Sequence, residues 1–143
     1  MIRLIYISYA VRDFEQDELL ELLEQSRTNN QANDITGMLL YGGDNFFQVL
    51  EGEQDVVETL YEKIKKDPRH EDCFVYDKAI INERSFLNWS MAFRNLNIEN
   101  LRKMDGYNEF LNKNVHPKEF AKYDKKTLNL LDKFKHNTNY ETI

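Results

Sequence analysis

The chain has 143 residues, enough for one domain with a substantial core and too few for two independent domains. It has 25 acidic and 19 basic residues, a net charge of -6 and no basic cluster, so we expect no direct nucleic-acid partner. The single cysteine, Cys73, excludes a disulfide framework and a cysteine-based metal site. No secretory signal opens the chain and no stretch approaches roughly 18 apolar residues, so we expect a cytoplasmic protein without a membrane span.

The first predicted element is a strand at residues 3–9, a run of β-branched and aromatic residues. Side chains alternate along a strand, so Ile5 and Ile7 lie on one face and Tyr6 on the other. Both faces need cover, which places the Tyr6 phenol in the interior. Such a tyrosine is commonly a core residue whose hydroxyl meets a backbone carbonyl.

An amphipathic helix is predicted at residues 14–30, with acidic residues near its positive end. Its apolar face becomes polar toward the C-terminal end. Ser26 and Asn30 lie there four residues apart, at positions where a purely buried helix would carry leucine or alanine. The alternative is that Asn29 and Asn30 form a frayed C-terminus before a turn.

A hairpin follows, with strands predicted at residues 35–41 and 46–52 and a turn at 42–45. The second strand reads FFQVLEG, an apolar run that ends in an acid and a glycine, and Gln48 is the one amide inside it. A buried amide without partners costs about 1–3 kcal/mol, so something polar must meet it. That group is either a neighbouring backbone or water, or a ligand.

The next apolar positions recur at helical spacing from Val56 to Ile64, before Asp67 and Pro68 end the helix. Arg69 and His70 therefore follow a helix exit. Two more strands are predicted, at residues 73–81 and 89–93.

This order predicts an α+β fold, a ferredoxin-like βαββαββ sandwich with both helices on one sheet face. Residues 116–135 have a single apolar stripe that indicates a helix, preceded by a shorter helix near residues 98–104. We expect these C-terminal helices to cover the other sheet face. The expected division is a domain at residues 1–95 and a helical extension at 96–143 packed on it.

Several polar or soft side chains are predicted to converge between the sheet and the first two helices. They are Tyr6, Ser26, Asn30, Gln48, Trp89 and Met91. Such a set in an apolar layer indicates a slot for a flat ligand with hydrogen-bonding edges. The sequence contains no GxGxxG, P-loop or HExxH motif. It therefore gives no support for a nucleotide-binding protein with a phosphate-binding loop or for a metal-dependent hydrolase.

The chain resembles the BLUF family, domains for blue-light sensing using flavin. The resemblance rests on motifs that occur in family order: YISYA at residues 6–10, NN at 29–30, ITGML at 35–39, FFQVLEG at 46–52, DPRH at 67–70 and WSM at 89–91. Together they span nearly all of residues 1–95. Because no cyclase, phosphodiesterase or DNA-binding segment follows, the chain resembles the short stand-alone members.

The resemblance implies a non-covalent flavin, usually FAD, with FMN and riboflavin as alternatives. It also implies the residues that contact the flavin: Tyr6, Ser26, Asn29, Asn30, Gln48, Ile64, Asp67, Arg69, His70 and Met91. Asn30 is expected at the pyrimidine end of the ring and Ile64 on the ring face. Arg69 and His70 are expected on the ribityl-phosphate side.

The implied mechanism is photochemical rather than enzymatic, with Tyr6, Gln48, Trp89 and Met91 as the photoactive residues. Tyr6 passes an electron and a proton toward the excited flavin, and the Gln48 amide rearranges before both return. The signal then passes to residues 97–143, and from there to a partner protein or an oligomer. The alternatives are a flavin-dependent reductase and a ferredoxin-like binding module without a cofactor.

Overall fold

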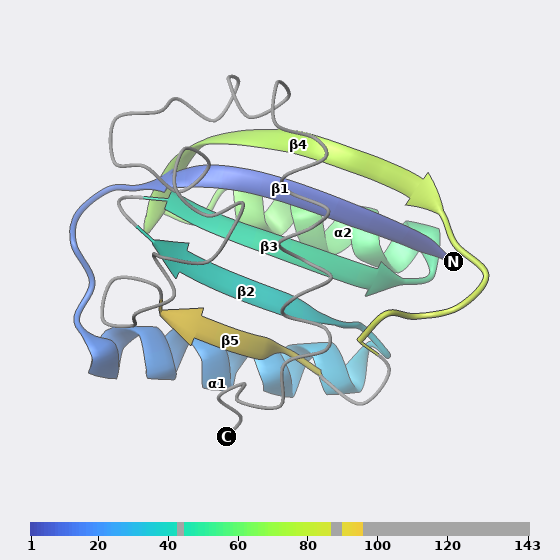
Figure 1. The fold of residues 1–143 in the computed structure, drawn as a ribbon, viewed down its shortest axis with the longest axis horizontal. Helices are drawn as coiled ribbons and strands as arrows, with labels where there is room; N and C mark the ends of the chain where they lie inside the picture. The colour runs from blue at the N-terminus through green and yellow to red at the C-terminus, as the bar shows by residue number, and fades with distance from the viewer. Residues whose placement is uncertain (43–44, 87–89, 96–143) are drawn as a thin grey trace, which may run out of the picture.

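A computed structural model describes residues 1–42, 45–86 and 90–95, which form one sheet and two helices (Figure 1). The strands are β1 (Ile2–Ala10), β2 (Thr36–Gly42), β3 (Asn45–Gly52), β4 (His70–Ile80) and β5 (Ala92–Asn95). The helices are α1 (Gln16–Ala32) and α2 (Gln54–Lys65). The strand order is β4-β1-β3-β2-β5, antiparallel except for the parallel pair of β2 and β5.

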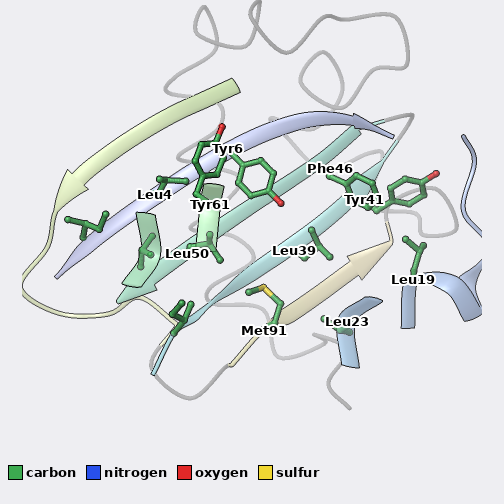
Figure 2. Close-up of a cluster of buried hydrophobic side chains, with 13 residues drawn as sticks. Leu4, Tyr6, Leu19, Leu23, Leu39, Tyr41, Phe46, Leu50, Tyr61 and Met91 are labelled. Carbon is green, nitrogen blue, oxygen red and sulfur yellow. The ribbon is translucent and has the colours of Figure 1, made fainter. Parts of the chain in front are cut away.

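Both helices lie on the same face of the sheet, as the sequence predicts (Figure 1). Leu19 and Leu23 from α1 and Val57 and Tyr61 from α2 belong to one buried cluster with side chains of the sheet (Figure 2). The first four strands and two helices have the ferredoxin-like arrangement, and β5 extends the sheet beyond β2. The predicted α+β fold is therefore confirmed.

Local sequence signals explain where α1 starts and where α2 stops. A capping box precedes α1, in which the Glu15 N–H donates to Glu18 Oε1 at 3.2 Å. Lys63 and Lys65 lie in the last turn of α2, where positive charge is favourable. Pro68 then disfavours helical geometry in the residue before it.

The predicted boundaries were wrong by two or more residues at three elements, α1, β4 and β5. α1 begins and ends two residues later than expected. β4 begins at His70 rather than at residue 73, because its pairing with β1 extends to the Ala10 and His70 pair. β5 begins at Ala92, which pairs with Met38, so Met91 precedes the strand instead of lying within it.

The sheet face opposite α1 and α2 carries Ile5, Ile7, Phe47 and Val49, all fully buried. The helix predicted at residues 116–135 and the shorter one at 98–104 lie outside the described residues, as does Trp89. The proposed docking of the C-terminal helices and the domain boundary after residue 95 thus stay predictions.

Candidate functional site

A pocket of about 220 Å³ opens between α1, α2 and the sheet. Its apolar lining consists of Leu22, Leu39, Phe46, Leu60 and Ile64. Its polar lining consists of Tyr6, Gln25, Ser26, Asn29, Asn30, Gln48, Lys63, Asp67, Arg69 and His70. All of the predicted flavin-contacting residues except Met91 are therefore brought together here.

Tyr6 and Gln48 form the polar base of this pocket. They lie opposite each other on β1 and β3, and the Tyr6 hydroxyl donates to Gln48 Oε1 at 2.5 Å. Both are buried, with 3% and 5% of their surfaces exposed. Burial, followed by the nearby Cys73 and Tyr61, raises the pKa of the Tyr6 phenol well above its ordinary value. Tyr6 is therefore a protonated donor, and the carbonyl end of the amide points at it.

The other end of the Gln48 amide contacts Met91. Gln48 Nε2 donates to Met91 Sδ at 3.5 Å, and Met91 is 1% exposed. A thioether sulfur is a weak acceptor. The buried amide thus has a short hydrogen bond at its oxygen and a weak one at its nitrogen, an asymmetry that favours reorientation when a stronger partner is near.

Residues just before β5 are bound to α1 through their backbone. Asn30 Nδ2 donates to the Ser90 carbonyl at 2.8 Å, and Arg27 Nε donates to the Met91 carbonyl at 2.8 Å. Asn30 was expected to contact the flavin, and in the structure its amide nitrogen donates to the Ser90 carbonyl instead. Arg27 was absent from the sequence prediction, although it follows Leu19 and Leu23 at four-residue spacing on the buried side of α1.

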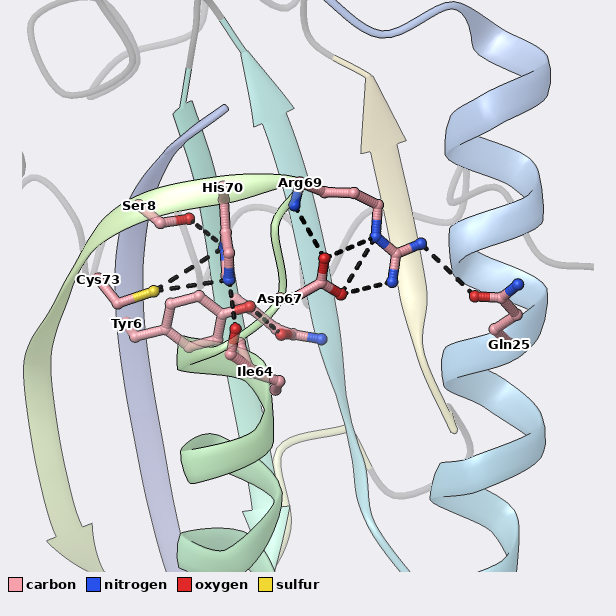
Figure 3. Close-up of polar contacts among 9 residues, drawn as sticks. Tyr6, Ser8, Gln25, Ile64, Asp67, Arg69, His70 and Cys73 are labelled. Carbon is pink, nitrogen blue, oxygen red and sulfur yellow. Dashed lines mark hydrogen bonds and ion pairs between the residues drawn. The ribbon is translucent and has the colours of Figure 1, made fainter. Parts of the chain in front are cut away.

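The pocket rim carries the Asp67 and Arg69 ion pair (Figure 3). Arg69 Nη2 lies 2.6 Å from Asp67 Oδ2, and this hydrogen-bonded pair lowers the pKa of Asp67 and raises that of Arg69. Arg69 Nη1 also lies 3.5 Å from Gln25 Oε1 on α1. Arg69 therefore connects the turn after α2 to α1 across the rim.

His70 has partners on both ring nitrogens (Figure 3). Nε2 lies 2.5 Å from the Ile64 carbonyl, and Nδ1 lies 2.8 Å from Ser8 Oγ. A carbonyl only accepts, so Nε2 carries a proton. A contact from His70 to a ribityl or phosphate group stays a prediction, and it would require one of these bonds to break.

The lining fits an isoalloxazine ring. Such a ring is flat, with apolar faces and a hydrogen-bonding pyrimidine edge, and the pocket combines apolar walls with amides and a phenol at its base. Ser26, Asn29 and Ile64 line the pocket, and their contacts to a flavin remain predictions. In the described part of the chain, no three His, Cys, Asp or Glu residues gather to hold a metal ion. The described helices include none long and apolar enough to cross a membrane.

Comparisons with known proteins identify the family of this chain. A family model for sensors of blue-light using FAD matches residues 1–92. Photoactivated adenylate cyclase subunit beta of Euglena longa is 38% identical over 90 residues, which are 62% of this chain and 10% of that protein. The blue light- and temperature-regulated antirepressor BluF of Escherichia coli (strain K12) is 39% identical over 67 residues, 47% of this chain and 17% of BluF. The chain thus spans a small part of these relatives' length.

Two solved structures match along almost the whole chain. BlsA in its photo-activated state has a TM-score of 0.76 and 31% identity, and the match covers 99% of each chain. BlrB, a BLUF protein in its dark state, has a TM-score of 0.72 and 25% identity over 94% of each chain. With the family model matching most of the chain and the Tyr6 and Gln48 pair at the base of the pocket, the chain belongs to the BLUF family.

Proposed function

We propose that this chain is a blue-light photoreceptor that binds FAD non-covalently in the pocket between α1 and α2. The main supporting observation is the buried series of hydrogen bonds that runs from Tyr6 and Gln48, which line the pocket, to Met91. Family membership supports FAD as the flavin, since the family is described by its use of FAD. FMN and riboflavin share the same ring and differ only beyond it.

The residues that line the pocket would contact different parts of the flavin. Gln48 and Asn30 supply hydrogen-bonding groups for the ring edge, and Ile64 supplies an apolar surface for a ring face. Ser26 and Asn29 add polar groups from α1. Asp67, Arg69 and His70 also line the pocket, and they would hold the ribityl-phosphate chain of the bound flavin.

The light response is a rearrangement of hydrogen bonds. A bound flavin absorbs blue light and, once excited, is a strong one-electron oxidant. Tyr6 would pass an electron and its hydroxyl proton to the bound flavin, which would remove the donor of the bond to Gln48 Oε1. The amide then turns so that Nε2 and Oε1 exchange places. Electron and proton return to Tyr6, so no net oxidation occurs, and the turned amide persists because it offers a donor and an acceptor in either orientation.

Signal output is proposed to pass through a partner protein or self-association. The relatives named above are an adenylate cyclase subunit and an antirepressor, so the family's light-sensing unit occurs with different outputs. Residues 96–143 are the proposed route, which begins with the contact between Gln48 and Met91 that is lost when the amide turns. A cytoplasmic location fits this role.

Illumination of the purified protein without a reductant tests the proposal. The expected result is a yellow protein whose visible spectrum shifts reversibly to the red under blue light without bleaching. A colourless protein would favour a binding module without a cofactor. Bleaching that requires an added electron donor would favour a flavin-dependent reductase.

A further inference from the structure

The buried side of α1 contains a charged residue. Leu19, Leu23, Arg27 and Asn30 are the buried residues of this helix, and Arg27 is only 8% exposed. Removing a guanidinium from water is unfavourable unless hydrogen bonds compensate, and burial lowers the pKa of Arg27. A leucine at this place would pack without that cost, so the contacts of Arg27 need an explanation.

Arg27 binds the backbone of the residue that contacts Gln48. Its Nε donates to the Met91 carbonyl at 2.8 Å, and the neighbouring Ser90 carbonyl accepts from Asn30 at 2.8 Å. A hydrogen bond from a charged donor is stronger than a neutral one. Two side chains of α1 therefore fix the backbone just before β5, and the bond from Arg27 is the stronger of the two.

The Met91 side chain lies where this backbone anchor places it. Its Sδ is 3.5 Å from Gln48 Nε2. Its Cε lies 3.4 Å from the point where a Cβ on Gly37 would be, so β2 closes the space behind the sulfur. The bond between Gln48 and the sulfur is weak, whereas the bond between Arg27 and the carbonyl is strong. The sulfur therefore stays in place when the amide turns away.

We propose that Arg27 is a positioning residue for the light response, which keeps the Met91 sulfur opposite Gln48 and so speeds the return of the amide to its dark orientation. The inference rests on the proposed function, because it concerns the return of the Gln48 amide after illumination. In the dark orientation Nε2 has the sulfur as its acceptor, whereas in the turned orientation Oε1 faces the sulfur without a hydrogen bond. A fixed sulfur thus favours the dark orientation.

The first test measures dark recovery after a blue-light pulse. Arg27→Met keeps the side-chain length and removes every N–H, so we expect an unchanged red shift and a recovery slowed about tenfold or more, the effect of losing a hydrogen bond from a charged donor. Arg27→Lys retains a charged donor and should recover close to the wild-type rate. Leu23→Met, a volume-conserving change one turn earlier on the same side, is the control for loosened helix packing and should leave recovery unchanged.

A second readout follows the Arg27 side chain by NMR, first without light and then with it. In the flavin-free protein, the Arg27 Nε–H resonance, assigned by its absence in Arg27→Lys, should exchange slowly with solvent. In the flavin-bound protein, this resonance should shift reversibly on illumination. A normal wild-type photocycle with unchanged recovery in Arg27→Met, or equal slowing in Leu23→Met, would overturn this inference alone. A wild-type protein that shows no red shift would overturn the proposed function and this inference together.

Discussion

Tyr6 and Tyr61 are two buried phenols whose ring centroids lie 5.4 Å apart, and of the two it is the Tyr6 hydroxyl that reaches Gln48. Burial raises the pKa of both, that of Tyr61 to about 12. The two residues therefore share an environment and differ in their hydrogen bond. This difference allows the photochemical role of Tyr6 to be separated from its packing.

Tyr6→Phe should abolish the light response and leave the fold intact. The substitution keeps the ring and its packing and removes only the hydroxyl that donates to Gln48. We expect the variant to bind flavin and to unfold close to the wild-type temperature, with no reversible red shift under blue light. Absorption spectra before and after illumination measure this.

Tyr61→Phe is the matched control, since it removes a hydroxyl from the neighbouring ring without touching Gln48. It should retain the red shift. A normal, reversible red shift in Tyr6→Phe would contradict the mechanism, and Gln48 would then be an ordinary buried amide on a core strand.

The lowered pKa of Asp67 predicts how the stability of the fold depends on pH in acid. Its hydrogen bonds from Arg69 lower its pKa below the ordinary value of 3.8. A carboxyl with a lowered folded-state pKa stabilises the fold above its unfolded pKa, and the contribution is lost as pH falls through the folded value. Wild type should therefore lose stability below about pH 4 more steeply than Asp67→Asn in acid titrations followed by circular dichroism. Parallel titration curves for the two proteins would show that the ion pair contributes nothing to stability.

At the scale of elements, Glu51 joins the end of β3 to the loop after β4. Its carboxylate is 0% exposed and accepts from the backbone N–H groups of Ser85 at 2.8 Å and Phe86 at 2.9 Å. Arg84 strengthens the junction by donating to the Glu51 carbonyl at 3.2 Å and to the Asp34 carbonyl at 2.8 Å. The chain that leads to Met91 is therefore fixed at residues 84–86 as well as at α1.

Glu51→Gln should destabilise this junction. The glutamine amide has one acceptor oxygen, and its NH2 group would face the backbone N–H that the second carboxylate oxygen accepts in wild type. At least one of the buried N–H groups of Ser85 and Phe86 therefore loses its acceptor, which costs about 1–3 kcal/mol. Urea unfolding should show that loss, and hydrogen exchange should accelerate at Ser85 and Phe86. Glu83→Gln, an exposed acid in the same loop, is the control. Equal stability of Glu51→Gln and wild type would show that the buried carboxylate is dispensable.

The elements that the sequence predicts correctly are those with long periodic patterns. The runs around Tyr6 and Gln48 are apolar enough to be recognised as central strands. The structure pairs the two residues directly, whereas in the sequence they are linked only through the family resemblance. β5 was misplaced because it is a four-residue edge strand, too short for a periodic signal, and its limits are set by pairing with β2. Tertiary contacts with α1 decide the conformation of Ser90 and Met91.

Two buried charged residues were not recognised from sequence, because charged residues normally face solvent. Glu51 was interpreted as the polar end of a strand, and Arg27 was not considered part of the buried side of α1. Both are buried, since backbone groups from distant parts of the chain meet their charges. No local pattern reports such partners, which lie 34 and 64 residues away along the chain.

At the scale of the whole molecule, the sheet has two apolar faces with different roles. One packs against α1 and α2, and these helices leave the pocket open between them and the sheet. The other carries Ile5, Ile7, Phe47 and Val49 from the two central strands, with no polar residue among the four. Large apolar side chains on both faces require a third layer in the molecule or in an assembly.

We predict that residues 116–135 form a helix docked on that second face, because their apolar side chains recur in a single stripe at helical spacing. Truncation after Asn97 removes this segment and should lower the thermal unfolding temperature, expose apolar surface and increase binding of a hydrophobic dye. Replacing Leu130 and Phe134 by glutamate in the full chain is the control for truncation, as it keeps the length and should give the same direction of change. A truncated protein that stays monodisperse, with unchanged unfolding temperature and no added dye binding, would contradict the docking.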